Sequence, residues 1–296
     1  MNGETPRTDG RRGRAARRAE RLAPQTSAGG NIKRRIPTYD LLGEEDLAKI
    51  EDTADTILQE IGIDFRNDPY AIGLWKDAGA DIQGDRVRIP KGLVRKLCST
   101  APHEFTQHAR NPARNVVFGG ANVIFAPAYG SPFVRDLTGG RRYGSLEDFK
   151  NFVRLAYLSP HLHHSGGTVC EPVDIPVSKR HLDMVLAHLT YSDKAFLGGV
   201  TAPGRATDCI DMCRTVFGAE TVERDCVILG NVNVNSPLVY DGTVTTVMRA
   251  YAEANQGVIV TPFILGGAMG PVTNAGAIAQ AHAETMAGIA FTQMVR

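Results

Sequence analysis

Three asparagines at alternate positions are the clearest polar pattern in this 296-residue sequence. Asn231, Asn233 and Asn235 lie at the end of an apolar run that is typical of a β-strand. Successive side chains of a strand point to opposite faces, so all three amides share one face. Buried amides without partners are costly. This face therefore either lines a polar cavity that could bind a ligand or carries structural hydrogen bonds, and the residues alone leave both open.

The other polar residues do not form a known catalytic motif. The sequence contains no HExxH motif, no Ser-His-Asp order and no glycine-rich phosphate loop. His161, His163 and His164 precede a predicted strand, which is the end opposite to the functional loops of βα units, so we expect structural roles for them. The five cysteines are too scattered for a disulfide framework, and no zinc site is complete. We therefore predict no metal site.

Four strand-like apolar runs, starting about 30 residues apart, organise the second half of the chain. They cover residues 167–170, 195–200, 226–233 and 257–265. Helical segments follow them at 177–190, 206–217, 241–254 and 275–295. This alternation predicts βα units around a parallel sheet.

The number of βα units favours part of a barrel. Four units are half of the eight in a (β/α)8 barrel. A doubly wound sheet would normally carry a glycine-rich phosphate loop, which the Gly-Gly pairs here do not form. We therefore predict the α/β class, with residues 160–296 as the first half of a TIM (β/α)8-type barrel. Its two open sheet edges would favour homo-oligomers or assembly with a complementary half.

An N-terminal α+β region is predicted at 37–159, after a basic tail at 1–36. Its expected helices are 44–60, 71–78, 90–99 and 147–158, the last capped by Ser145 with Asp148. Its expected strands are 86–89, 104–109, 115–118, 123–126 and 133–136. The tail holds nine arginines and one lysine in residues 1–35 against three acidic residues, and it has few large apolar side chains. We predict that it is disordered.

The composition is that of a globular protein, with 43% hydrophobic and 22% charged residues, which excludes collagen-like and wholly disordered chains. No apolar run is long enough to span a bilayer, and the N-terminus lacks a signal-peptide core. We therefore expect a cytoplasmic protein without a membrane partner. The basic tail could bind nucleic acid, but the rest of the chain is acidic and has no nucleic-acid-binding signature, so no such partner is expected.

A series of short stretches occurs in a distinctive order from about Tyr39 to the last residue. They are 57–63, 75–80, 87–90, 101–105, 109–112, 146–149, 192–194, 235–238 and 270–273, followed by Gln280 and Glu284. On these stretches the chain resembles the trimethylamine methyltransferase family, the MttB-like proteins. Archaeal members carry pyrrolysine in a later part of the barrel than this chain reaches. We therefore expect a truncated member, or one without pyrrolysine.

The resemblance implies an activity. Family members pass a methyl group from a methylated amine to the cobalt of a separate corrinoid protein. We therefore expect a methyltransferase that acts on trimethylamine or on a quaternary amine such as glycine betaine, with a corrinoid protein as partner and no cofactor bound directly. A catalytically inactive barrel fragment that needs a complementary half is the alternative. An unrelated barrel lyase or hydrolase is a third possibility, but it would need a metal or phosphate site.

The expected substrate selects the candidate site residues. A quaternary ammonium cannot donate a hydrogen bond, so aromatic faces and carboxylates suit it. The candidate substrate-binding residues are Tyr129, Glu171, Asn231, Asn233, Tyr240 and Phe263. Core packing is the alternative for the three rings, and a solvated loop is the alternative for Glu171. Gln280 and Glu284, one helical turn apart, could face the site or hydrogen bond along their helix. No catalytic residue is predicted.

Overall fold

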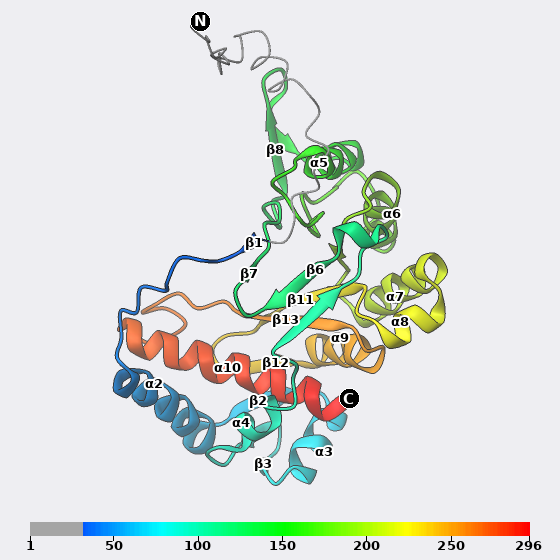
Figure 1. The fold of residues 1–296 in the computed structure, drawn as a ribbon. Helices are drawn as coiled ribbons and strands as arrows, with labels where there is room; N and C mark the ends of the chain where they lie inside the picture. The colour runs from blue at the N-terminus through cyan, green and yellow to red at the C-terminus, as the bar shows by residue number, and fades with distance from the viewer. Residues whose placement is uncertain (1–31) are drawn as a thin grey trace, which may run out of the picture.

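A parallel three-stranded sheet lies near the centre of the molecule (Figure 1). The structure is a computed structural model, and it describes residues 32–296. The strands β10 (Phe196–Leu197), β11 (Ile228–Val234) and β13 (Gly257–Pro262) pair in this order and run parallel. Four helices belong to these βα units: α7 (Pro203–Phe217), α8 (Ala219–Arg224), α9 (Gly242–Glu253) and α10 (Asn274–Val295). The α/β class is therefore confirmed.

The predicted strand at 167–170 is wrong. The backbone carbonyls of this segment accept hydrogen bonds from a side chain and from another loop, and they do not pair with a neighbouring strand. The Gly167 carbonyl accepts a hydrogen bond from Nε2 of His188 at 2.9 Å, and the Thr168 carbonyl accepts one from the Gly130 amide at 2.7 Å. The parallel sheet of the described residues thus has three strands and is open. The predicted four-stranded half barrel is not confirmed.

Tyr251 of α9 fixes which face of the parallel sheet the helices cover. A Cβ atom added to Gly230 of β11 would lie 2.8 Å from the Tyr251 ring, and one added to Gly198 would overlap the Tyr251 hydroxyl. That hydroxyl donates to the Gly199 carbonyl at 3.0 Å. Gly230 therefore faces the helices. Since side chains alternate along a strand, Asn231 faces the other way.

A second sheet joins the N-terminal region to the βα units. Its strand order is β12 (Val239–Asp241), β2 (Ile63–Arg66), β4 (Arg86–Arg88) and β3 (Asp81–Gln83), with β12 parallel to β2. The long helix α10 contacts β13 on one side and α2 (Glu44–Thr56) and α4 (Leu93–Cys98) on the other (Figure 1). Strand pairing and helix packing thus cross the predicted boundary near residue 159.

An aromatic cluster forms the core between these two regions. The Phe65 ring lies 5.6 Å from Trp75 of α3 (Pro69–Asp77), 5.3 Å from Tyr240 and 5.9 Å from Phe291, measured between ring centroids. All four side chains are fully buried. Such rings bury large apolar areas, so they hold the N-terminal strand β2 against β12 and α10.

The remaining elements are two helices and a set of short strands and turns. They are β1 (Ile32–Lys33), the π-helical turn Ile57–Ile61, β5 (Glu104–Gln107), the 3-10 turn Pro112–Arg114, β6 (Val116–Gly119), β7 (Asn122–Val123), β8 (Phe133–Asp136), β9 (Gly140–Tyr143), α5 (Leu146–Leu158) and α6 (Arg180–Tyr191). Residues 1–31 of the predicted tail lie outside the described residues, whereas Ile32 and Lys33 pair with β7. No helix within 32–296 has the length and apolar character needed to cross a membrane.

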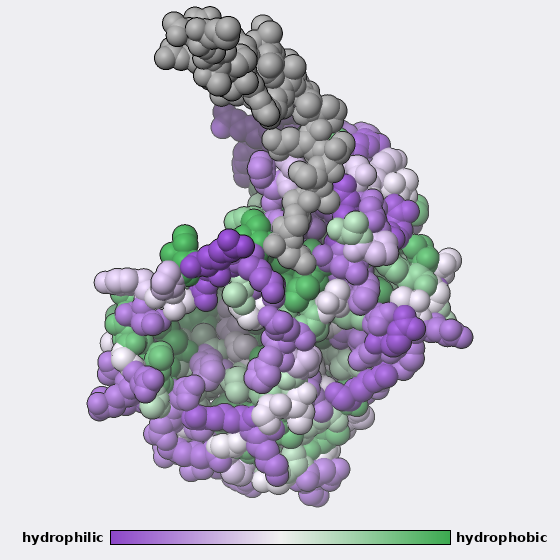
Figure 2. All heavy atoms as spheres, viewed as in Figure 1, coloured by the Kyte–Doolittle hydropathy of each residue, from purple (hydrophilic) through white to green (hydrophobic). Residues whose placement is uncertain are grey.

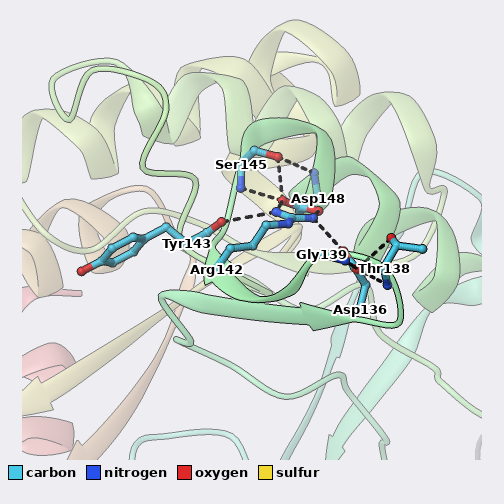
Figure 3. A network of polar contacts seen from close by, with 7 residues as sticks. All are labelled: Asp136, Thr138, Gly139, Arg142, Tyr143, Ser145 and Asp148. Atoms are coloured by element: carbon cyan, nitrogen blue, oxygen red, sulfur yellow. Dashed lines mark hydrogen bonds and ion pairs between the residues drawn. The ribbon is translucent and has the colours of Figure 1, made fainter.

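The β8–β9 hairpin is tied to the start of α5 (Figure 3). The Arg142 guanidinium donates to both carboxylate oxygens of Asp148, at 2.5 and 2.7 Å, and to Asp136 at 3.1 Å. The Asp148 carboxylate also accepts from the Ser145 amide, which confirms the predicted cap as a reciprocal capping box. The bond from Arg142 holds the pKa of Asp148 well below its usual range.

Buried glutamine side chains form hydrogen bonds with the backbone at the amino ends of the parallel strands. Gln107 donates to the carbonyls of Phe196 and Val227, and its own oxygen lies 3.2 Å from Nε2 of His164. Gln256 accepts from the amides of Val227 and Ile228 at 2.8 and 3.1 Å. Backbone groups at a strand end otherwise lack partners. The side chains therefore satisfy them where the sheet ladder stops.

The buried histidines make stability depend on pH. Burial lowers the pKa of His164 to about 3 and that of His188 to about 4, whereas an unfolded histidine titrates near 6.5. Below pH 6.5 the unfolded chain therefore binds protons that the folded chain does not bind. The free energy of unfolding must then fall as the pH falls, by about 2 kcal/mol per histidine between pH 7.5 and 5.

We expect His188→Gln to lose about half of this pH dependence of the free energy of unfolding. The other half remains, because His164 is still buried and neutral in the folded chain. Urea unfolding at pH 7.5 and pH 5 measures the difference. His161→Gln is the matched control, since His161 is exposed. Equal pH dependence in His188→Gln and the wild-type chain would contradict this assignment.

Candidate functional site

A row of polar side chains lies on the uncovered face of the parallel sheet, toward the carboxyl ends of β11 and β13. We call Asn231, Asn233 and Thr261 the amide row. Asn233 is exposed, and Asn231 is half-buried, whereas Val232 and Val234 between and beyond them are buried on the helix side. The register places Asn233 directly beside Thr261. The predicted alternation is therefore present for Asn231 and Asn233, whose amides lie on the face away from the helices, whereas Asn235 follows the end of β11 and is exposed.

The Thr261 hydroxyl connects the amide row. It lies 2.7 Å from the Val232 carbonyl oxygen, 3.2 Å from the side-chain oxygen of Asn231 and 2.8 Å from that of Asn233. A hydroxyl has one hydrogen, so it donates to one of the three oxygens. The Val232 carbonyl can only accept, so it takes that hydrogen. The asparagines then contact the hydroxyl best with their amide nitrogens turned toward it, which leaves their oxygens toward the open face.

Tyr129 and Glu171 form a second group, beside β10. The Gly130 amide bonds to the Thr168 carbonyl and the Glu171 amide bonds to the Ser131 carbonyl, at 2.7 and 2.8 Å, so the two segments run together. The Tyr129 side chain is 45% exposed, and the partial desolvation of its hydroxyl raises its pKa, with the Glu171 carboxylate acting in the same direction. Tyr129 therefore stays a neutral phenol near a carboxylate.

Arg180 neutralises the acidic member of this group. Its guanidinium forms an ion pair with the Glu171 carboxylate, and it also donates to the Ile175 carbonyl at 3.0 Å. Glu171 is half-buried and Arg180 more so. A cationic ligand at Glu171 would therefore meet a carboxylate that already has a positive partner, which weakens the attraction.

The two groups are linked through β10. A Cβ atom on Gly167 would lie 2.8 Å from the Tyr129 ring and 2.9 Å from the Cβ of Leu197. Leu197 in turn pairs with Leu229, two residues before Asn231. Tyr129 and the amide row therefore belong to the same end of the sheet, with β10 between them. Figure 2 shows the surface hollowed left of centre, where Figure 1 draws the chain leaving β11 and β13.

The remaining predicted rings lie in different places. Tyr240 is fully buried, stacks on Phe65 and donates its hydroxyl to the Glu284 carbonyl at 2.8 Å. It packs in the core and cannot contact a substrate in this arrangement, so it is not included in the site. Phe263 is 63% exposed and follows Thr261 by two residues just past β13. Its ring is free to contact a ligand.

Thr261 and Arg180 were not predicted. Thr261 stands two residues before Phe263 on a strand that the sequence shows, so alternation along that strand was the available signal. Nothing in the sequence pairs Arg180 with Glu171. A cavity of about 550 Å³ lies elsewhere, at the amino ends of the strands, and its lining includes Phe105, Cys226 and Gly257. Within residues 32–296 no group of three histidine, cysteine or acidic side chains could hold a metal ion.

The fold and the site define an α/β protein whose polar groups gather at the carboxyl end of a parallel sheet, where βα loops carry function in this class. Residues 8–296 match the family model described as trimethylamine methyltransferase (MTTB). The chain belongs to this family, as the sequence resemblance predicted.

The chain is also similar to two curated proteins whose names state a substrate. The chain is 40% identical over 261 residues to the glycine betaine methyltransferase of Desulfitobacterium hafniense (strain Y51), covering 88% of this chain and 54% of that protein. It is 23% identical over 247 residues to the proline betaine:corrinoid methyltransferase of Eubacterium limosum, covering 81% of this chain and 50% of that protein. The chain thus spans about half the length of the curated relatives it matches.

The burial of Tyr240 and the exposure of Phe263 predict different effects on stability. We expect Tyr240→Ala to lower the free energy of unfolding by about 3–5 kcal/mol, because it empties a core position. Phe263→Ala should change it by less than about 0.5 kcal/mol, since the ring is exposed. Urea unfolding of both variants tests the assignment. Similar losses for the two would show that Phe263 is packed or that Tyr240 is not.

Proposed function

We propose that the chain contributes the methyl-donor site of a corrinoid-dependent methyltransferase, and that the donor is a quaternary amine of the betaine type. Two relatives are named for betaines, and one of these names includes a corrinoid. The observation that carries the proposal is the amide row, which presents two asparagines on an uncovered sheet face without a basic or acidic neighbour in the row. Trimethylamine, named in the family description, is the alternative donor.

A betaine offers two different groups to this site. Its carboxylate accepts hydrogen bonds. The side-chain nitrogens of Asn231 and Asn233 each carry two hydrogens, so one can contact the Thr261 hydroxyl while the other is offered to the carboxylate. Its quaternary nitrogen has no hydrogen to donate, so an aromatic face suits it, and Tyr129 and Phe263 supply such faces. Neutral Tyr129 adds no charge of its own. The proposed roles of these residues are binding and orienting the donor, so that one methyl group points away from the protein.

The methyl acceptor would come from a partner. A corrinoid carried by a second protein would supply the nucleophile for the methyl group. The C–N bond would break with its electron pair staying on nitrogen, so the donor's quaternary ammonium becomes a neutral tertiary amine while its carboxylate keeps the negative charge. The chain's own residues hold the donor while this happens, and much of the rate gain then comes from alignment.

We also propose that the βα units belong to a (β/α)8-type barrel. Three parallel strands follow one another in sequence order, with helices between them. In the described residues β13 pairs on one side only. The relatives are about twice as long as the matched segment. The same unpaired edge favours the second candidate, in which the chain is inactive until a complementary half pairs with β13.

The activity can be tested directly. The chain is incubated with glycine betaine and chemically reduced cobalamin, which replaces the partner protein as methyl acceptor. Formation of dimethylglycine, followed by NMR, supports the proposal. Trimethylamine in place of glycine betaine distinguishes the two donors. No product with either donor, even when a polypeptide covering the second half of the longer relative is added, would count against the proposed function.

Substitutions in the amide row should weaken donor binding. We expect Asn233→Ala to raise KM for glycine betaine about ten- to hundredfold, the range for a lost hydrogen bond to a charged group. Tyr129→Leu should raise it about two- to thirtyfold, the range of a cation–π contact. Tyr70→Leu is the control, because Tyr70 is 39% exposed and its ring on α3 contacts Arg249 of α9 instead of the amide row. Unchanged KM in both site variants would exclude this site.

A further inference from the structure

A buried carboxylate on α10 has partners that belong to a loop rather than to its own helix. Glu284 is fully buried. Its oxygens accept hydrogen bonds from the Leu238 amide at 2.8 Å, the Ser236 hydroxyl at 2.6 Å and Nε2 of Gln280 at 2.9 Å. The bond expected along the helix is therefore present, but two of the three donors lie in the turn between β11 and β12.

The Leu238 amide and the Gln280 side-chain nitrogen can only donate, so the Glu284 carboxyl group accepts from both. Within residues 32–296 no lysine, arginine or histidine forms an ion pair with it. Burying a carboxyl group costs free energy unless its oxygens are hydrogen-bonded, and apolar residues can often replace a buried polar group and its partners without loss of stability. Packing alone thus gives no reason for a carboxylate here. The reason must lie in what it holds.

Gln280 extends the contact to a second loop. Its side-chain nitrogen has two hydrogens, and both are used: one goes to Glu284 and the other to the Met269 carbonyl at 3.1 Å. Its oxygen lies against Gly270, where an added Cβ would approach to 3.1 Å. Gln280 is itself buried. The pair therefore reaches residues 236–238 on one side and 269–270 on the other.

Both loops leave the carboxyl ends of the strands that carry the amide row. The first begins directly after Asn235 and returns through a hydrogen bond from the Asn235 amide to the Val239 carbonyl at 3.0 Å. The second begins with Phe263 and ends where α10 starts. Apart from Leu238, most residues of these two loops are exposed or half-buried. A fixed contact beneath them would limit their movement.

We propose that Gln280 and Glu284 are positioning residues that hold these two loops in one arrangement around the methyl-donor site. This rests on the proposed function and deepens it. Neither side chain touches the donor. The pair sets where Asn235 and Phe263 stand relative to the amide row, so its loss should weaken donor binding before it affects the chemical step.

The main test is Gln280→Ala, with Gln293→Ala as matched control. Gln293 is the same residue type on the same helix, and its contact is Thr100, at the other end of α10. We expect Gln280→Ala to raise KM for glycine betaine about tenfold with kcat within twofold. Hydrogen exchange should speed up in 263–273 and in 235–240, and remain unchanged elsewhere. Gln293→Ala should change neither the kinetics nor the exchange in these loops.

Two variants of Glu284 distinguish the effect of its hydrogen bonds from the effect of its charge and size. Glu284→Gln keeps one oxygen for the Leu238 amide, and the Ser236 hydroxyl can rotate to accept from the new NH₂ group. It should therefore raise KM less than threefold. Glu284→Ala removes the acceptor for all three partners and should exceed Gln280→Ala in the rise of KM and in the rate of loop exchange. Rescue by the conservative variant is what a positioning role requires.

Two results would overturn the inference. One is a Gln280→Ala variant that behaves like Gln293→Ala in both KM and exchange. The other is faster exchange spread evenly over the chain, which marks general destabilisation. If the wild-type chain shows no methyl transfer but the exchange pattern is as expected, the loop contact is supported and the proposed function alone fails.

Discussion

The burial of α10 on two sides is the constraint on which the rest of the structure depends. The helix α10 has small and apolar side chains on all of its sides, and such a helix needs protein on every side. Here α2 and α4 cover one side, and β13 covers the other. Small residues make this contact close: Ala283 and Ala287 are fully buried, and Gly288 admits the Tyr240 hydroxyl. The N-terminal region and the βα units therefore have to fold against the same helix.

The strongest periodic patterns were predictable from the sequence, because they arise from local rules. The helices α5, α7, α9 and α10 stand close to the expected ranges, and Ser145 with Asp148 forms the expected cap. The failures share one cause. Residues 167–170 look like a strand by composition, but the side chain of His188 and the Gly130 amide take their carbonyls. Such competition comes from distant residues and leaves no local trace.

The residues of the candidate site also fall into those that a local pattern could place and those that only long-range contacts place. Alternation placed Asn231 and Asn233 on one face, and the structure has them there because Gly230 faces Tyr251. Tyr240 stood beside an aspartate in what looked like a loop, yet it belongs to a strand, β12, that pairs with β2. That pairing joins residues more than 170 positions apart, and no short-range pattern announces it. The ion pair between Arg180 and Glu171 was equally invisible for the same reason.

The contact of Tyr251 with two glycines has a consequence for how this part of the chain can vary among relatives. The ring fills the space that side chains at 198 and 230 would need, and its hydroxyl holds the Gly199 carbonyl at the end of β10. The three positions can therefore change size only as a set. A relative with alanine at 230 must carry a smaller residue at 251. It would then lose the phenol that fixes the end of β10, and its sequence should show a different donor for that carbonyl.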